Sequence, residues 1–138
     1  MRDLARLPQL ATGFNQHLGF RLVEWSPAFA RTRAPLRPEM LNSQGIAHGG
    51  LYCTFLDFNC GLAGIYHEPD ETPKTCITLS LTTNFVAPAR TGILHGTGRV
   101  IGGGHKIFYA EAQIHDDDGA LLATATGTFK YSHRVQAG

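Results

Sequence analysis

The chain has 138 residues and a mass of 15.0 kDa, so we expect a single domain over residues 1–138. Its hydrophobic content of 43% excludes intrinsic disorder, and its charged content of 17%, below the roughly 25% of an average soluble domain, predicts a surface partly hidden by another subunit. The formal net charge of +1 argues against nucleic acid as a partner, because nucleic-acid binders carry a strong basic excess.

The first eighteen residues place apolar side chains at helical spacing, and we expect an N-terminal helical segment over residues 1–18. Residues 19–25 and 29–36 predict two strands. The turn-forming residues that come next predict a loop over residues 37–48. At the other end of the chain, residues 132–138 are predicted to be a flexible tail.

Residues 49–66 predict one long buried helix. Its large apolar side chains recur every three or four residues and predict a stripe that faces a sheet: Leu51, Phe55, Phe58, Leu62 and Ile65. A flank of mostly small residues predicts close contact with a second helix: Gly50, Cys53, Asp57, Gly61 and Gly64. Asp57 stands near the middle of the segment, where a charge is costly in lipid, so no membrane association is expected.

After the helix, alternating apolar and polar residues predict four meandering strands. The alternation is clear at residues 77–82, 108–115 and 121–130, and turn signals fall at residues 102–104 and 118–119. With the two earlier strands, these make an antiparallel sheet of about six strands. One helix can be wrapped by such a sheet if the sheet curves, so the predicted fold class is α+β with one long buried helix.

The three cysteines, Cys53, Cys60 and Cys76, are predicted to be reduced thiols. Cys53 and Cys60 lie about 10 Å apart on the predicted helix, which is too far for a disulfide. No pair of Cys or His residues has the spacing of a zinc site, so we expect no metal. Because the sequence also shows no signal peptide, we predict a cytoplasmic protein.

The segment from Asn42 to Gly50 and the later Asp57 carry the residues best suited to catalysis. Backbone N–H groups at the start of a helix are unpaired and lie at the positive end of its dipole, so Gly49 can present one to a carbonyl oxygen. Asn42 can add a side-chain amide and complete a hole for an oxyanion. Asp57, in apolar surroundings, suits a base or a nucleophile. His48 is either a base or, more simply, a helix-entry residue bonded to the backbone.

Gly49 and Asp57 are eight residues apart, about 12 Å along one helix, so they cannot touch the same carbonyl carbon. Two antiparallel copies of the helix would bring Gly49 of one chain near Asp57 of the other. We therefore predict a homodimer with shared active sites, which also accounts for the low charge content.

The chain resembles the hotdog-fold acyl-CoA thioesterases of the phenylacetate-degradation type. The resemblance covers residues 19–131 and rests on Asn42, Gly45, His48, Gly49, Gly50, Leu56, Asp57, Phe85, Pro88 and residues 118–123. It implies a hotdog fold and hydrolysis of an acyl-CoA thioester to the free acid and CoA. No cofactor is implied, because CoA is part of the substrate. The resemblance also implies a tetramer built as a dimer of dimers.

The resemblance assigns roles residue by residue. It implies Asp57 as general base or nucleophile, with the Gly49 N–H and Asn42 polarising the thioester carbonyl. A hydroxyl on the strand after the helix would hold the water; Thr78 matches best, with Thr75 and Thr82 as alternatives. The remaining implied contacts are to the substrate and its CoA nucleotide: Gly50, Phe85, Pro88, Arg90, Gly104, His105 and Lys106. Residues 72–110 contain four basic residues and no acid, an environment that suits CoA phosphates.

Two other functions fit the same residues. One is a non-catalytic acyl-CoA-binding domain, in which Asp57 only caps a partner helix. The other is an acyl-thioester dehydratase with His48 as its base. Release of free thiol from a panel of aryl and aliphatic CoA esters separates the three functions. It also reports the acyl group, which we expect to be aromatic, in contact with Tyr52, Phe55, Phe58 and Phe85, or of medium chain length.

Overall fold

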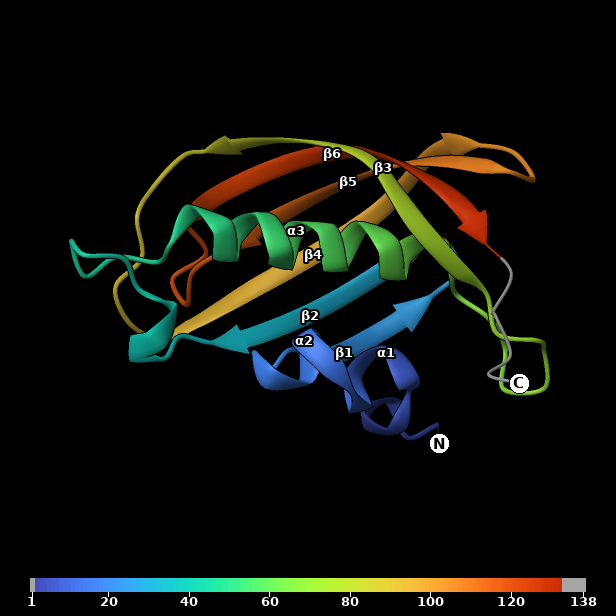
Figure 1. The fold of residues 1–138 in the computed structure, drawn as a ribbon, viewed down its shortest axis with the longest axis horizontal. Helices are drawn as coiled ribbons and strands as arrows, with labels where there is room; N and C mark the ends of the chain where they lie inside the picture. The colour runs from blue at the N-terminus through green and yellow to red at the C-terminus, as the bar shows by residue number, and fades with distance from the viewer. Residues whose placement is uncertain (1, 133–138) are drawn as a thin grey trace.

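The computed structural model describes residues 2–132 (Figure 1). The elements in chain order are η1 (Leu4–Arg6), α1 (Pro8–Ala11), α2 (Gly13–His17), β1 (Arg21–Ser26), β2 (Phe29–Pro35), η2 (Pro38–Met40), α3 (Gly49–Gly64), β3 (Thr75–Phe85), β4 (Ile93–Gly103), β5 (Ile107–His115) and β6 (Leu121–Ser132). The predicted tail lies outside the described residues except for Ser132, which ends β6.

The six strands form one antiparallel sheet in the order β1-β2-β4-β5-β6-β3. The sheet curves around α3, as Figure 1 shows, and the predicted hotdog architecture is confirmed. The prediction that the last four strands form a meander is wrong for β3, which pairs with β6 rather than with β4. Strand β4 pairs with β2 instead. This order places β3 on the far edge, where it covers a flank of α3 that the other strands leave open.

The predicted apolar stripe of α3 is buried along its whole length. Two buried polar side chains, Thr32 and Asn59, connect α3 to the sheet. The Thr32 hydroxyl on β2 donates to Asn59 Oδ1 at 2.6 Å, and Asn59 Nδ2 donates to the Phe55 carbonyl oxygen at 2.7 Å. A Cβ on Gly98 would overlap the carbonyl oxygen of Asn59, so β4 can lie this close to α3 only with glycine at residue 98.

Two residues of the small-residue flank of α3, Cys53 and Gly64, contact the protein's own sheet. Cys53 Sγ lies 3.6 Å from Thr83 Oγ1 on β3. A Cβ on Gly64 would overlap the Phe108 ring on β5. The prediction that this flank meets another helix is therefore wrong for these residues, because their small size serves the close approach of β3 and β5.

A β-bulge in β3 changes which of its residues face the helix. The pairing with β6 shifts register between Thr78 and Ser80, so Leu79 is the extra residue. Ile77 and Leu79 are 56% and 54% exposed, whereas Thr78 lies opposite Phe129 and its side chain reaches α3. Since one extra residue reverses the two faces of a strand, the simple alternation predicted for this segment is wrong.

Residues 2–18, called the N-terminal segment below, lie along β1 (Figure 1), and Gln9 and Asn15 line the same cleft as Asp57 and Phe58 of α3. Leu7 and Leu10 are buried in the core, while Arg2 lies over the Trp25 ring and donates to the His67 carbonyl oxygen. Each helical piece of the segment is too short to be stable alone, so these contacts hold it in place.

Among residues 2–132, no helix combines the length and the apolar character that crossing a membrane requires.

Candidate active site

Asp57 lies in the middle of α3 and is bonded to Thr78 on β3. The Thr78 hydroxyl donates to Asp57 Oδ1 at 2.6 Å. Burial raises the pKa of Asp57 above its ordinary value, and the hydrogen bond from Thr78 offsets part of this increase. The carboxylate is therefore a stronger base than one in water, and one of its two oxygens is held in a fixed orientation.

Asp57 and Thr78 lie in a cleft of about 260 Å³ between α3, β3 and the N-terminal segment, which we call the acid cleft. Its apolar lining comes from Phe58, Leu62, Ile65 and Phe129, and two polar side chains, Gln9 and Asn15, come from the N-terminal segment. A site of this kind, apolar with a few polar groups, is typical of small-molecule binding.

The thiol of Cys76 also lines the acid cleft. Burial, with a smaller contribution from the charge of Asp57, raises its pKa to about 11. A thiol with this pKa stays protonated near neutral pH, and the thiolate is the nucleophilic form. Cys76 is therefore not a rival to Asp57 as a reacting group.

The start of α3 carries hydrogen-bond donors, and we call Asn42, His48, Gly49 and Gly50 the donor end. His48 is the N-cap residue, and its Nδ1 accepts the Gly50 N–H at 2.8 Å. No acceptor within residues 2–132 takes the Gly49 N–H. This donor lies at the positive end of the helix dipole, where it can bind an anion.

Asn42 holds the loop that leads into the donor end. Its Oδ1 accepts the N–H of Gln44 at 2.9 Å and the N–H of Ile46 at 3.3 Å. Because the amide oxygen is engaged twice, the NH2 group is the part of the side chain left to donate to a ligand.

The loop after β3 returns beside the donor end. Arg90 Nη1 donates to the Gln44 carbonyl oxygen at 3.2 Å. The Phe85 ring lies next to Gly49, where a Cβ on the glycine would be 3.5 Å from the ring. Pro88 is exposed in the same loop. The structure therefore brings Phe85 to the donor end and Arg90 to the loop that leads into it.

The aromatic residues predicted to contact the acyl group are dispersed. Phe58 lines the acid cleft, whereas Phe55 is fully buried against Phe20, with ring centroids 4.9 Å apart. Tyr52 is also buried, and its ring stacks on Phe85 at 6.3 Å. The prediction is wrong for Phe55 and Tyr52, because their side chains pack into the core beneath α3.

The turn at residues 104–106 lies at the other end of α3. The Tyr131 N–H donates to the Lys106 carbonyl oxygen at 2.9 Å, and the Tyr131 hydroxyl donates to the Gly64 carbonyl oxygen at 2.9 Å. Gly64 ends the 16-residue helix, so this turn, with Gly104, His105 and Lys106, lies about 24 Å from the donor end. Within one subunit the predicted residues therefore form three separate groups.

Of the three hydroxyls considered for holding the water, the one on Thr78 contacts Asp57. The Thr75 hydroxyl donates to the Ser132 carbonyl oxygen at 2.7 Å. Thr82 is exposed and pairs with Thr126 on the outer face of the sheet. The bulge in β3 accounts for the difference, since it turns Thr78 inward and Thr82 outward.

Sequence reasoning missed Gln9 and Asn15 as residues of the acid cleft. Polar residues in a helical segment are normally solvated, and their spacing does not show that one face of the segment closes a cleft. Asp57 was found because a charge within an apolar helix is unusual. No comparable signal marks the N-terminal segment.

Proteins of similar sequence or fold point to one family. A sequence model described as Thioesterase superfamily matches residues 44–123, which include Asp57 and Thr78. The medium/long-chain acyl-CoA thioesterase YigI of Salmonella typhimurium is 29% identical over 129 residues, covering 84% of this chain and 83% of YigI. A phenylacetic acid degradation-related protein from Ralstonia eutropha has a TM-score of 0.76 and 26% identity, covering 91% of this chain and 92% of its own. Thioesterase HI1161 from Haemophilus influenzae shares the fold, with a TM-score of 0.83 and 20% identity over 99% of this chain and 95% of its own.

The curved sheet around one long helix, together with the matched sequence, defines a hotdog-fold thioester hydrolase. The superfamily match spans more than half of the chain, and the chain belongs to the thioesterase superfamily. The predicted enzyme class is confirmed.

Proposed function

We propose that the protein hydrolyses an acyl-CoA thioester, with an aryl or medium-chain acyl group, to the free acid and CoA. The observation that carries this proposal is the contact of Asp57 with Thr78 at 2.6 Å inside a mostly apolar cleft. Such a carboxyl group combines a raised pKa with a fixed orientation, which suits proton removal from water or direct attack. The activity named for YigI supports acyl-CoA as the substrate class.

We also propose a homodimer in which each active site joins the acid cleft of one subunit to the donor end of the other. The distance of about 12 Å between Gly49 and Asp57 in one helix supports this arrangement, because the two residues of one subunit cannot act on the same carbonyl group. Strand β3 supports this arrangement, because it carries the exposed Ile77 and Leu79 and no strand of residues 2–132 pairs with its outer edge. An antiparallel copy across β3 would bring Gly49 of the partner subunit towards Asp57. Two such dimers would make the expected tetramer.

In the reaction with Asp57 as base, the oxygen of a water molecule bonds to the thioester carbonyl carbon while Asp57 takes one of its protons. The carbonyl oxygen becomes negatively charged, and the Gly49 N–H and the Asn42 side-chain NH2 of the partner subunit stabilise it. The C–S bond then breaks, and the departing CoA sulfur receives the proton from Asp57. Thr78 keeps the carboxylate oriented throughout.

In the alternative route, Asp57 attacks the carbonyl carbon itself, CoA leaves, and water hydrolyses the resulting acyl–aspartyl anhydride. Borohydride added during turnover separates the two routes. It would reduce an anhydride at Asp57 and change the mass of the peptide that contains it. With Asp57 as base, that peptide would keep its mass.

We propose that the CoA phosphates contact positive charge from both ends of α3. Arg90 is exposed beside the donor end, and His105 and Lys106 are exposed beyond the last turn of α3. In an antiparallel dimer the end of one α3 lies near the start of the other, so both groups would serve one CoA. We propose Gly50 and Pro88, at the donor end, as further substrate contacts.

Asp57→Asn tests the proposed function. We expect kcat to fall by about 10²–10⁴, because the variant keeps the shape of the side chain but cannot take up a proton or attack. Free thiol released from a panel of aryl and medium-chain CoA esters is the measurement, and circular dichroism checks the fold. Turnover near the wild-type level in Asp57→Asn would overturn the role of Asp57.

The same assay distinguishes the alternatives. A wild-type protein that binds CoA esters without releasing thiol would be a non-catalytic binding domain. The dehydratase alternative requires His48 as a base, but its Nδ1 already accepts the Gly50 N–H. The absence of a cofactor from the reaction and the cytoplasmic location stay predictions.

A further inference from the structure

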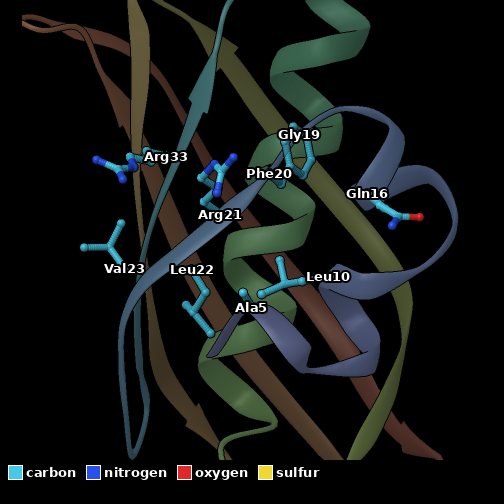
Figure 2. Close-up of a pocket in the computed structure, with 9 residues that line it drawn as sticks. All are labelled: Ala5, Leu10, Gln16, Gly19, Phe20, Arg21, Leu22, Val23 and Arg33. Atoms are coloured by element: carbon cyan, nitrogen blue, oxygen red, sulfur yellow. The ribbon is translucent and has the colours of Figure 1, made fainter. Parts of the chain in front are cut away.

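The N-terminal segment forms one wall of the acid cleft, and its two faces differ. On one face, Gln9 and Asn15 line the acid cleft together with Asp57. The other face borders a separate cavity of about 490 Å³ against β1, with Leu10 and Gln16 in its lining (Figure 2). The segment therefore borders both the acid cleft and this second cavity. Gln9 lines the acid cleft, and Gln16 lines the second cavity.

Gln9 lines the acid cleft, and its side-chain amide oxygen lacks a hydrogen-bond partner within the described part of the chain. Its backbone is held in place, because Asn15 Nδ2 donates to the Gln9 carbonyl oxygen at 2.9 Å. Its side-chain Oε1 is buried and has no hydrogen-bond partner among residues 2–132. A buried amide oxygen that lacks a donor is costly to a folded protein. A ligand that supplies an O–H group at this point would remove that cost.

The remainder of the acid cleft offers a ligand mainly apolar contacts, from Phe58, Leu62, Ile65 and Phe129. One amide in such a pocket fixes the position of one polar group and disfavours a ligand that leaves the amide unpaired. Since Asp57 acts at the thioester, the Gln9 amide would contact a part of the acyl group remote from the thioester.

The catalytic residues and this wall come from different parts of the chain. Asp57 and Thr78 lie within residues 44–123, which match the thioesterase superfamily, whereas Gln9 and Asn15 lie outside that match. The proposed base or nucleophile and its hydrogen-bond donor therefore lie in the matched region, whereas the N-terminal wall of the cleft, which can differ between family members, lies outside it.

We propose that Gln9 is a specificity-determining residue that selects acyl groups carrying a hydroxyl remote from the thioester over plain hydrocarbon chains of the same length. Gln9 Oε1 accepts the hydrogen bond from this hydroxyl, and Asn15 positions the Gln9 backbone. This inference rests on the proposed hydrolysis of acyl-CoA at Asp57.

The test compares kcat/KM for octanoyl-CoA with kcat/KM for two hydroxyoctanoyl-CoA isomers, with the hydroxyl in the middle or at the end of the chain. We expect the wild-type protein to prefer one isomer over octanoyl-CoA by about tenfold. Gln9→Leu, which keeps similar bulk but accepts no hydrogen bond, should abolish this preference. Gln16→Leu is the matched control, because Gln16 lines the other cavity (Figure 2), and it should keep the wild-type preference.

A wild-type protein that prefers octanoyl-CoA to both isomers, or treats all three esters alike, would overturn the role of Gln9. A preference that survives Gln9→Leu would do the same. Should Gln9→Leu fail to fold by circular dichroism, Gln9→Met gives the same comparison with a more flexible side chain. Hydrolysis of octanoyl-CoA without a hydroxyl preference overturns this inference alone, whereas no thiol release from any ester of the panel overturns the proposed function with it.

Discussion

The donor end and the acid cleft lie on the same helix, yet they are built from different kinds of contact. The donor end is local in sequence, because His48 caps Gly50 and Asn42 ties its own loop within nine residues. The acid cleft is assembled from the N-terminal segment, α3 and β3, and a bulge turns Thr78 inward. The donor end therefore depends on backbone geometry, whereas the acid cleft depends on packing between distant segments. Substitutions in the two regions should therefore have different effects on activity and stability.

The largest expected effect at the donor end comes from removing one backbone donor. Gly49 is the first residue of α3, a position where proline is well tolerated, and His48 before it has φ −62° and ψ 137°, as a residue preceding proline requires. Gly49→Pro should therefore keep the helix but lose the N–H. We expect kcat to fall by about 10²–10³, the usual cost of one oxyanion-hole donor.

Gly49→Ala is the matched control for Gly49→Pro. It keeps the N–H, and its Cβ would lie at an ordinary contact distance of 3.5 Å from the Phe85 ring. We expect kcat for thiol release to stay close to wild type in Gly49→Ala. Equal losses in the two variants would show that space at residue 49, rather than its N–H, limits the reaction.

In the acid cleft, Thr78→Val removes the hydrogen bond to Asp57 while keeping the shape of the side chain. We expect kcat to fall by about tenfold, because Asp57 loses its fixed orientation. The pKa of Asp57 should rise further, since the Thr78 hydroxyl lowers it in the wild-type protein. The measurement is kcat/KM against pH: activity that needs the carboxylate is lost as pH falls, and this acid limb should move to higher pH in Thr78→Val.

Thr82→Val provides the control on the same strand. Thr82 is exposed on the outer face, opposite Thr126, so its replacement should leave the acid limb where it is. An equal shift in Thr78→Val and Thr82→Val would mean that strand β3 as a whole, and not one hydroxyl, sets the pKa of Asp57.

The two regions also differ in how far they could be predicted from sequence. His48, Gly49 and Asn42 were predicted because helix capping and turn formation are encoded by neighbouring residues. Thr78 was identified only by resemblance, with two rivals, because a β-bulge has no reliable signature in a single sequence. Gln9 was missed altogether, since a long-range contact decides which face of a short helical piece closes a cleft.

The fold shows the same division between local and long-range information. The long helix and its buried stripe follow from the spacing of apolar residues, and all five stripe residues are buried. The meander prediction was wrong because alternation in a strand does not indicate its neighbour. The pairing of β3 with β6 depends on how the sheet closes around α3, which no local pattern contains.

A smaller effect is expected when the cap of α3 is changed. His48→Ala removes the acceptor for the Gly50 N–H and should lower the free energy of unfolding by about 1 kcal/mol. His48→Asn supplies another good N-cap and should restore most of this stability. The measurement is the midpoint of denaturant unfolding, followed by kcat of both variants. Loss of turnover in a stable His48→Asn protein would show that the imidazole takes part in the chemistry.

The smallest expected effect is on the stability of Asp57→Asn, and its sign distinguishes a catalytic carboxylate from a structural one. The pKa of Asp57 is raised by burial above its ordinary value of 3.8. The folded state then binds the proton more tightly than the unfolded state, so folding stability falls as pH rises from about 3.8 through the raised pKa, and the loss persists at higher pH.

Asparagine carries no charge and escapes this penalty, while its amide oxygen can still accept the Thr78 hydrogen bond. Asp57→Asn should therefore be slightly more stable than wild type at neutral pH and indistinguishable from it near pH 3, as measured by denaturant midpoints at the two pH values. A variant less stable than wild type at neutral pH would mean that the carboxylate holds the fold together, which is what a capping role predicts and a buried catalytic base does not.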